Sequence, residues 1–433
     1  MSIDRRRFRC PSVARPMITG DGYLARLAPL DAPLNKARLH LLAKASQRWG
    51  NGIVEVTRRG NLQCRGFPRR EDGAFQSVLG TLPGQSGSRF PISLDPMGLL
   101  QPALEPLMRA LYAELHQRLS RDHSVQRAAP KISVVISAGG GVGYDTLAAD
   151  LKLHLEAAPD GPYIYVGLGR SLTPGDVRWQ GRTQCLRAAV DACLALLRAI
   201  GDEGPLARAW ALPCERIPRL KLTSASPALV NAYRVGDTLD RPVPARLWAV
   251  PQGRLEAVSL EALGDLCQRL GAAAWPLPGR RLLIAGQRVR EADGPLRAIG
   301  MIDAPDHPLP YIDLCAGLSC SRSGLDTHGT ARRLAALLAV LPRPISVHLS
   351  GCPKRCARDT PALLTIAGDG HGGAIQVIVN GRPGDPALFE CVNSDALWAQ
   401  LPQWTARVAD APDRCQQPAH WRACWQALAD KVD

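Results

Sequence analysis

The strongest constraint on the fold is an internal repeat with an offset of about 220 residues, close to half of the 433-residue chain. Segment 24–62 resembles segment 244–283. Each has a short A-R-L strand, a linker, an amphipathic helix that ends in Q-R-x-G, and a second strand. An arginine falls at the centre of each second strand, Arg59 in the first copy and Arg280 in the other. The repeat therefore predicts two small β-α-β units.

A longer α/β stretch follows each small unit, so we expect an α+β or α/β protein with two small and two larger domains. Apolar periodicity and flanking glycines predict strands at 131–138, 162–169, 309–315, 345–352 and 374–381, and helices at 144–158, 183–201 and 327–341. The expected division is 1–67 (first small unit), 68–130 (surface connector), 131–235 (first α/β domain), 236–300 (second small unit), 301–409 (second α/β domain) and 410–433 (tail).

The charge balance points to an acidic partner or ligand. The chain has a formal charge of +14, and only 7 of its 53 basic residues are lysines. Arginine forms paired hydrogen bonds with carboxylates and phosphates, although a GC-rich genome that favours arginine codons would give the same excess. Nucleic acid is not expected, because the basic residues are scattered and aromatic residues make up only 5%.

The sequence predicts a cytoplasmic protein without a membrane span. Its N-terminus has no apolar run of the kind an export signal needs, and no apolar stretch reaches about 18 residues. The 13 cysteines are therefore expected to be free thiols or metal ligands rather than a disulfide framework.

Two cysteine pairs, Cys315/Cys320 and Cys352/Cys356, each follow a predicted strand in a glycine-containing loop. Zinc knuckles favour the tighter C-x2-C spacing, whereas a cubic [4Fe–4S] cluster accepts wider pairs from two loops. The spacing favours a cluster, with zinc and unligated thiols as the alternatives.

Two motifs resemble the sulfite and nitrite reductase superfamily. They are the second cysteine pair in SGCPKRC, and VTRRGNLQCRGF, in which Arg59 precedes Gln63 by four positions. The resemblance implies a duplicated nitrite/sulfite reductase-like architecture with two ferredoxin-like half-domains. It also implies that Arg59 and Gln63 line a tetrapyrrole site. Lys131 matches one of two lysines that face the substrate anion in the reductases, and the second position is Ser133. The first cysteine pair encloses four residues, where the superfamily usually has five.

Two further stretches, RCPSVARPMITGDGYLARL and KISVVISAGGGVGYDTLAADLKL, resemble the precorrin-3B synthase branch. That resemblance implies an oxygen-dependent monooxygenase of aerobic cobalamin biosynthesis, which hydroxylates precorrin-3A at C20 and closes a ring A lactone. The implied partners are precorrin-3A, dioxygen and an external electron donor. The implied cofactors are one [4Fe–4S] cluster, on Cys315, Cys320, Cys352 and Cys356, and a mononuclear non-haem iron.

Arginines on or beside the strands of both small units are candidates for binding a carboxylate-rich macrocycle. The predicted substrate-binding residues are Arg26, Arg59, Gln63, Arg65, Lys131, Arg246 and Arg280. Two other functions stay open: a sirohaem-dependent sulfite or nitrite reductase, in which Cys356 would also ligate the sirohaem iron, and a non-catalytic module stapled by a metal or a cluster.

Overall fold

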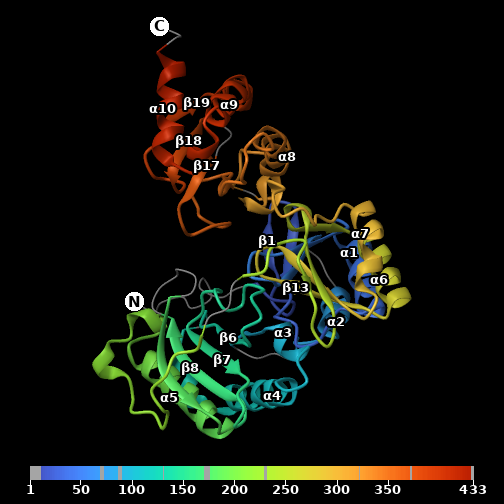
Figure 1. Cartoon of the computed structure of the whole chain (residues 1–433), viewed down its shortest axis with the longest axis vertical. Coiled ribbons are helices and arrows are strands. Elements are labelled where there is room, and N and C mark those ends of the chain that lie inside the picture. Colours follow the sequence, from blue (N-terminus) through green and yellow to red (C-terminus); the bar gives the residue numbers. More distant parts are fainter. Residues whose placement is uncertain are drawn as a thin grey trace.

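The computed structural model describes residues 11–68, 73–85, 90–129, 131–169, 176–228, 232–320, 322–370 and 373–430. A central body lies between two larger α/β domains (Figure 1). No helix within these residues is both long enough and apolar enough to cross a membrane.

The central body contains both small units, and each has more strands than the two predicted. The first comprises β1 (Met17–Thr19), β2 (Gly22–Arg26), α1 (Lys36–Trp49), β3 (Ile53–Val56), β4 (Leu62–Phe67) and α2 (Ala74–Gly80). The second comprises β10 (Thr238–Leu239), β11 (Ala245–Ala249), β12 (Arg254–Glu256), α6 (Ala257–Leu270), β13 (Ala273–Leu277), β14 (Arg281–Ala285) and α7 (Asp293–Ala298).

The predicted second strand of each unit is in fact a hairpin, and the matched arginine lies in its turn. Arg59 is in the turn between β3 and β4, and Arg280 is in the turn between β13 and β14. Gly60 and Gly279 have positive φ angles that suit a tight turn, and they interrupt the strand pattern.

The two units interlock into one body. The first sheet has the order β1-β2-β4-β3-β12, so the second unit contributes its β12 to the sheet of the first. Further bridges join Leu34 to Ala274 and Arg59 to Pro278. The helices α1 and α6 pack against each other on the outer side (Figure 1).

The two larger domains share one topology. The first holds β5 (Ile92–Leu94), α3 (Pro96–Leu99), α4 (Glu105–Arg121), β6 (Val134–Ser137), β7 (Leu151–Glu156), β8 (Tyr163–Gly169), β9 (Val177–Thr183) and α5 (Leu186–Asp202). The second holds β15 (Ile312–Leu314), α8 (Thr327–Leu338), β16 (Val347–Ser350), β17 (Ala362–Gly368), β18 (Ile375–Gly381), β19 (Phe389–Cys391), α9 (Ser394–Ala409) and α10 (Pro418–Ala429).

The sheet orders are β5-β6-β7-β8-β9 and β15-β16-β17-β18-β19. In both sheets the first three strands run parallel and the last two pair antiparallel. This match confirms the predicted fold class, a duplicated α+β architecture of two half-domains and two larger domains.

Several local predictions were wrong. The segment 144–158 was expected to be a helix, but it forms a loop and then β7, because leucines alternate with polar residues at 151–156 in the period-two pattern of a strand. Within the predicted connector, β5 pairs with β6 and α4 packs into the core of the first α/β domain. Within the predicted tail, α10 packs into the second α/β domain through Trp421.

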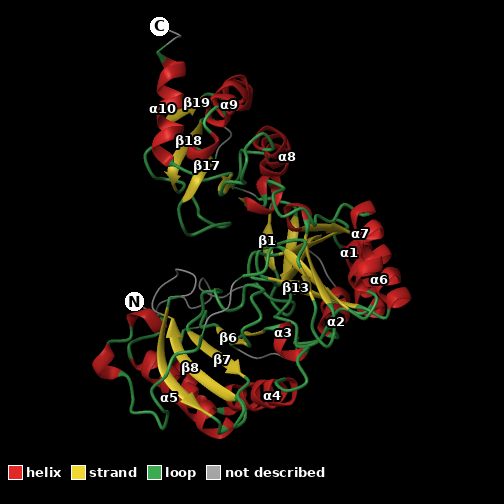
Figure 2. Cartoon of the chain, viewed as in Figure 1, coloured by secondary structure: helices red, strands yellow, loops and turns green. Residues whose placement is uncertain are grey.

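Each large sheet has one apolar and one polar face. Helices α4 and α5 cover one side of the first sheet (Figure 2), where Leu151, Leu153 and Leu155 join the core. Lys152 and His154 alternate with these leucines and so point to the other side. The second sheet repeats the arrangement with the cross-strand row Asp313, His348 and Thr365.

Candidate functional site

The four predicted cysteines lie at one edge of the second large sheet. The strands β15 and β16 are adjacent and parallel, so their carboxyl ends meet at the same edge. Cys315 directly follows β15, and Cys320 closes the short 3-10 turn after it. Cys352 is the second residue after β16, and Cys356 follows in the same loop. The local fold therefore presents both pairs from neighbouring loops, as the sequence predicted.

Backbone amides point at the first of these sulfurs. The N–H of Gly351 donates to Sγ of Cys315 at 3.2 Å, and the N–H of Gly317 donates to the same atom at 3.5 Å. A Cβ at position 351 would lie 1.7 Å from Oγ of Ser323, so a glycine is needed for this close backbone approach. The shortened first pair thus still places Cys315 where amide donors surround its sulfur.

The four thiols lie within electrostatic reach of one another. Partial burial raises the pKa of Cys356, and Cys352, Cys315 and Cys320 raise it further. Four thiols in loops with amide donors, next to the exposed Lys354, are the donor set that a [4Fe–4S] cluster uses. Within the described part of the chain, no three His, Cys, Asp or Glu side chains are grouped as a site for a single metal ion.

A largely buried carboxylate beside the cysteines pairs with arginines from three segments. Asp313, two residues before Cys315, pairs with Arg280 at 2.7 Å, Arg358 at 3.1 Å and Arg58 at 3.8 Å. Burial alone would raise the pKa of Asp313, but the three guanidinium groups outweigh it and lower the pKa. This ion cluster ties the central body to the cysteine-bearing edge.

His348 lies opposite Asp313 in the strand register and is fully buried. Burial lowers its pKa to about 4, and the neighbouring arginines add to that effect. Neither ring nitrogen has a hydrogen-bond partner among the described residues. A neutral, unpaired imidazole therefore adjoins the ion cluster on the polar face of the sheet.

Three of the predicted substrate-binding residues lie close together near the cysteines. Arg26 donates to Oε1 of Gln63 at 3.0 and 3.2 Å, and Gln63 in turn donates to Glu55. Arg65 is only 4% exposed and pairs with Asp21 at 3.2 Å and with Glu55 at 4.0 Å. Arg65 also donates to the carbonyl oxygen of Ser319, inside the first cysteine loop, at 2.9 Å. Arg65 therefore already has protein partners and braces that loop.

The two hairpin turns lie against each other and reach both large domains. The N–H of Gly279 donates to the carbonyl oxygen of Arg58 at 2.8 Å. Arg280 extends to Asp313 and to the carbonyl oxygen of Leu314. Arg59, in the other turn, lies near enough to lower the pKa of Lys152 in the first α/β domain. The two matched arginines therefore face different domains, Arg280 the second α/β domain and Arg59 the first.

The remaining two predicted residues lie elsewhere. Arg246 pairs with Asp303 at 2.9 Å and Asp293 at 3.1 Å. Lys131 is exposed and precedes β6, at the opposite end of that strand from the loop that follows it. Their roles in substrate binding stay predictions.

Sequence reasoning missed Asp313 and two of its partners, Arg58 and Arg358. A signal was present, because an aspartate in the apolar strand YIDLC, two residues before a cysteine, is rarely left without a partner. The partners themselves come from distant segments and carry no local signal.

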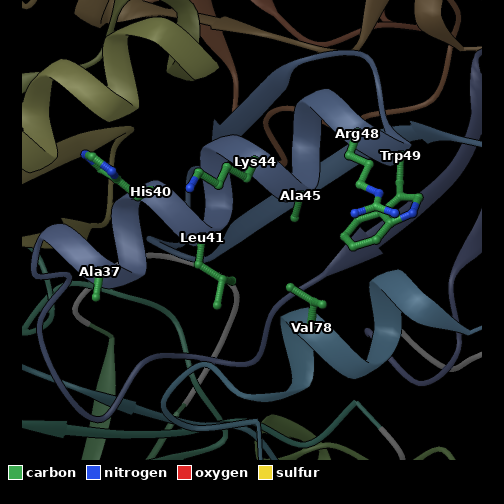
Figure 3. Close-up of a pocket in the computed structure, with 8 residues that line it drawn as sticks. All are labelled: Ala37, His40, Leu41, Lys44, Ala45, Arg48, Trp49 and Val78. Carbon is green, nitrogen blue, oxygen red and sulfur yellow. The ribbon is translucent and has the colours of Figure 1, made fainter.

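An open groove on α1 and α2 contains none of the predicted site residues (Figure 3). The guanidinium of Arg48 lies 5.1 Å from the centre of the Trp49 ring there. The groove is lined by Ala37, His40, Leu41, Lys44, Ala45, Arg48, Trp49 and Val78.

Comparison with known proteins finds relatives but no matching family model. A sulfite reductase (ferredoxin) 2 of Mycolicibacterium paratuberculosis is 31% identical over 207 residues, which are 42% of this chain and 37% of that protein. The structure of the Mycobacterium tuberculosis NirA protein superposes with a TM-score of 0.70 over 92% of this chain and 83% of that one, at 20% identity.

One relative matches over nearly the whole chain. The precorrin-3B synthase of Sinorhizobium sp. is 30% identical over 403 residues, which cover 87% of this chain and 84% of that protein. The similarity extends well beyond the cysteine segments and includes both halves of the duplication. The chain belongs to the precorrin-3B synthase family.

Proposed function

We propose that the chain is an iron–sulfur oxidoreductase that hydroxylates precorrin-3A at C20 with dioxygen, with closure of the ring A lactone. The observation that carries this proposal is the match to a precorrin-3B synthase over 84% of that protein. The geometry supports it, because four cysteines and several arginines adjoin the polar face of the second large sheet.

The four cysteines would hold a [4Fe–4S] cluster. Their loops supply amide donors to Cys315, and a cluster supplies one-electron transfer when it is bound. The predicted mononuclear iron has no three-residue His, Cys, Asp or Glu site within the described residues, so no step is assigned to it.

The chain's own residues would bind and orient the macrocycle. Arg59 is our leading candidate for a contact to a ligand carboxylate, since its turn reaches toward the first α/β domain. Arg58 is a second candidate, because its side chain is 36% exposed and its pair with Asp313 is long at 3.8 Å. Arg65 and Arg280 are held by carboxylates and would position neighbouring groups rather than bind the ligand. Arg246 lies elsewhere and is also held by carboxylates.

The proposed reaction balances as a monooxygenation. One oxygen atom of dioxygen enters the macrocycle and the other leaves as water, with two electrons from an external one-electron donor and two protons. The protein must therefore admit electrons near the cysteines and protons near the ligand.

The test is to purify the full chain without oxygen and to measure iron, sulfide and the visible spectrum. The protein is then given precorrin-3A, a reduced iron–sulfur donor and isotope-labelled dioxygen. We expect iron and sulfide in equal amounts and a product that carries one labelled oxygen atom. A product without the label, or an unchanged substrate, would contradict the proposal.

A sirohaem-dependent sulfite or nitrite reductase is the second candidate. It is favoured by the similarity to sulfite reductases, and by Cys356, the most exposed of the four cysteines and so accessible to a second metal centre. A Soret band in the purified protein, with sulfite or nitrite reduction, would select this function. Zinc without iron or sulfide would instead indicate a metal-stapled binding module.

A further inference from the structure

The duplication places an aspartate in the first α/β domain where the second carries its first cysteine. Asp95 directly follows β5, as Cys315 directly follows β15. The carboxylate of Asp95 accepts from the N–H of Met97 at 2.9 Å and of Ala138 at 3.3 Å. Cys315 accepts from the residue two positions on and from the residue directly after β16 in the same way. Asp95 and Cys315 are therefore equivalent positions.

Around Asp95 lies a buried cluster of charged and titratable groups. Asp145 accepts from the N–H of Gly141 at 3.2 Å and lies 3.5 Å from Nδ1 of His154. Lys152 donates to the carbonyl oxygen of Tyr144 at 3.0 Å and also to that of Asp145. Lys152 and His154 are each only 2% exposed and Asp95 is fully buried. These side chains share the polar face of the sheet under the loop 138–150.

Ionisation of Asp95 is unfavourable in this cluster, because burial of the neighbouring Asp145 is offset by His154, which lowers the pKa of Asp145 and so favours its charged form. Asp95 and Asp145 repel each other as carboxylates, and burial denies both of them the screening of water. The groups that face them are Lys152 and His154 on β7, Ser137 on β6, Tyr144 in the loop, Tyr165 on β8, and Arg59 and Arg281 from the hairpin turns. A proton shared among these groups relieves the repulsion.

The electrostatics of individual groups agree with this geometry. Burial and the nearby Asp145 raise the pKa of Asp95 to about 7. Burial lowers the pKa of Lys152 to about 8, and Arg59 contributes to the lowering. A metal ion does not suit the cluster, because the ammonium group of Lys152 is part of it and no three-ligand metal group occurs among the described residues.

We propose that Asp95, Asp145, Lys152 and His154 form an acid–base site that supplies protons to a ligand bound beside Arg59. The proposal rests on the proposed function, in which each turnover consumes two protons. In this proposal the sheet edge at Asp95 in the first α/β domain transfers protons, while the equivalent edge at Cys315 in the second transfers electrons. The site is refilled from solvent after each turnover.

The proton-holding part is tested on the full chain without any substrate. Infrared difference spectra between about pH 6 and pH 8 should show the carbonyl band of a protonated carboxylic acid that disappears as the pH rises. Asp95→Asn should abolish this band, while Asp191→Asn, a surface change on α5, should leave it in place. Absence of the band in the wild type, or its survival in Asp95→Asn, would overturn the proposal.

Lys152→Met provides a second variant in case Asp95→Asn does not fold. Loss of the cation disfavours the ionised carboxyl, so the Asp95 band should persist to higher pH than in the wild type. A band that titrates at the same pH in both proteins would contradict the assigned cluster.

Turnover tests the use of these protons. In Asp95→Asn and Lys152→Met we expect kcat to fall at least about tenfold with little change in KM, and the pH dependence near neutrality to be lost. Unchanged turnover and pH profile would refute the relay even if the band is present. If the wild type does not oxidise precorrin-3A, the proposed function fails, and the infrared result alone decides whether the cluster holds a proton.

Discussion

One largely buried carboxylate, Asp313, balances three arginines that arrive from two hairpin turns and from the loop after Cys356. Asp313→Asn would leave the largely buried guanidinium groups of Arg280 and Arg358 without their counter-charge. We expect a loss of about 3–5 kcal/mol in the free energy of unfolding, measured by denaturant titration. The exposed pair of Asp191 and Arg118 is the control, and Asp191→Asn should cost less than about 1 kcal/mol. Equal costs for the two variants would show that the arginines find other partners.

The proposed role of the cysteines as cluster ligands can be tested by spectroscopy. Cys352→Ala should remove most of the iron and sulfide and the visible absorption of the purified protein, because it removes one of four proposed ligands. Cys185→Ser, at an exposed position outside the cysteine loops, should keep the wild-type spectrum. An unchanged spectrum in Cys352→Ala would remove this residue from the ligand set.

His328, at the start of α8, should make the stability of the folded protein depend on pH. Burial lowers its pKa to about 3, and Nδ1 lies 3.3 Å from Oε1 of Gln252. Between about pH 6 and pH 4 the unfolded chain binds a proton at this histidine that the folded chain does not, so stability falls as the pH falls.

The stability advantage of wild type over His328→Gln should shrink by about 1.4 kcal/mol for each pH unit in that range. Denaturant titrations at several pH values measure it. The same substitution at the exposed His123 controls for the loss of an imidazole at the surface. A difference that does not vary with pH would contradict the buried, neutral assignment of His328.

At the scale of elements, the contact between the two hairpin turns can be tested by adding a methyl group to a glycine. Gly60 has a φ of +78°, and a Cβ there would lie 2.8 Å from the carbonyl carbon of Leu277. Gly52 has the same φ, but its Cβ would meet nothing within 4 Å. The pair therefore separates backbone strain from the contact between the units.

Gly52→Ala should destabilise the protein by about 1–2 kcal/mol through the backbone alone. Gly60→Ala should cost about 1–3 kcal/mol more, because the turns must separate to admit the methyl group. Thermal or chemical unfolding measures both. Equal losses would mean that the two turns are not packed against each other as described.

Helices were easier to predict from the sequence than turns and edge strands. The helices α5 and α8 follow their apolar periodicity and were predicted close to their observed bounds. The helices α1 and α6 end at the Q-R-x-G motif, as predicted. The loop and strand at 144–156 were misread because leucines that alternate for a sheet core also fit a helical spacing over a short window. The short β5 was not predicted, because it depends on pairing with β6 and no local pattern reveals that pairing.

The part of the candidate site that could be predicted is the part whose residues follow a recognisable spacing in the sequence. The two cysteine pairs could be predicted because each follows a strand and the strands are parallel neighbours. The arginines could be named as candidates for ligand binding, but their roles could not be predicted, since their partners lie far away in sequence. Arg246, for example, was expected in a ligand cleft but pairs with Asp293 and Asp303.

At the scale of the molecule, the duplication would allow one chain to combine the proposed electron and proton transfers. Both large domains present the same edge, with a residue after the first strand that accepts two backbone N–H donors. Thiols at this edge suit the binding of a cluster for electron transfer, and a buried carboxylate suits proton transfer.

The central body should transmit each change to one large domain and not to the other. Arg280 donates to Asp313 and to the carbonyl oxygen of Leu314, whereas Arg281 donates to the carbonyl oxygens of Val142 and Tyr233. Arg280→Met should therefore speed amide hydrogen exchange at 313–320 and leave 138–150 protected. Arg281→Met should have the reverse effect, because methionine keeps the apolar stem and loses only the donors. Faster exchange in both segments for either variant would mean that the two domains open as one unit.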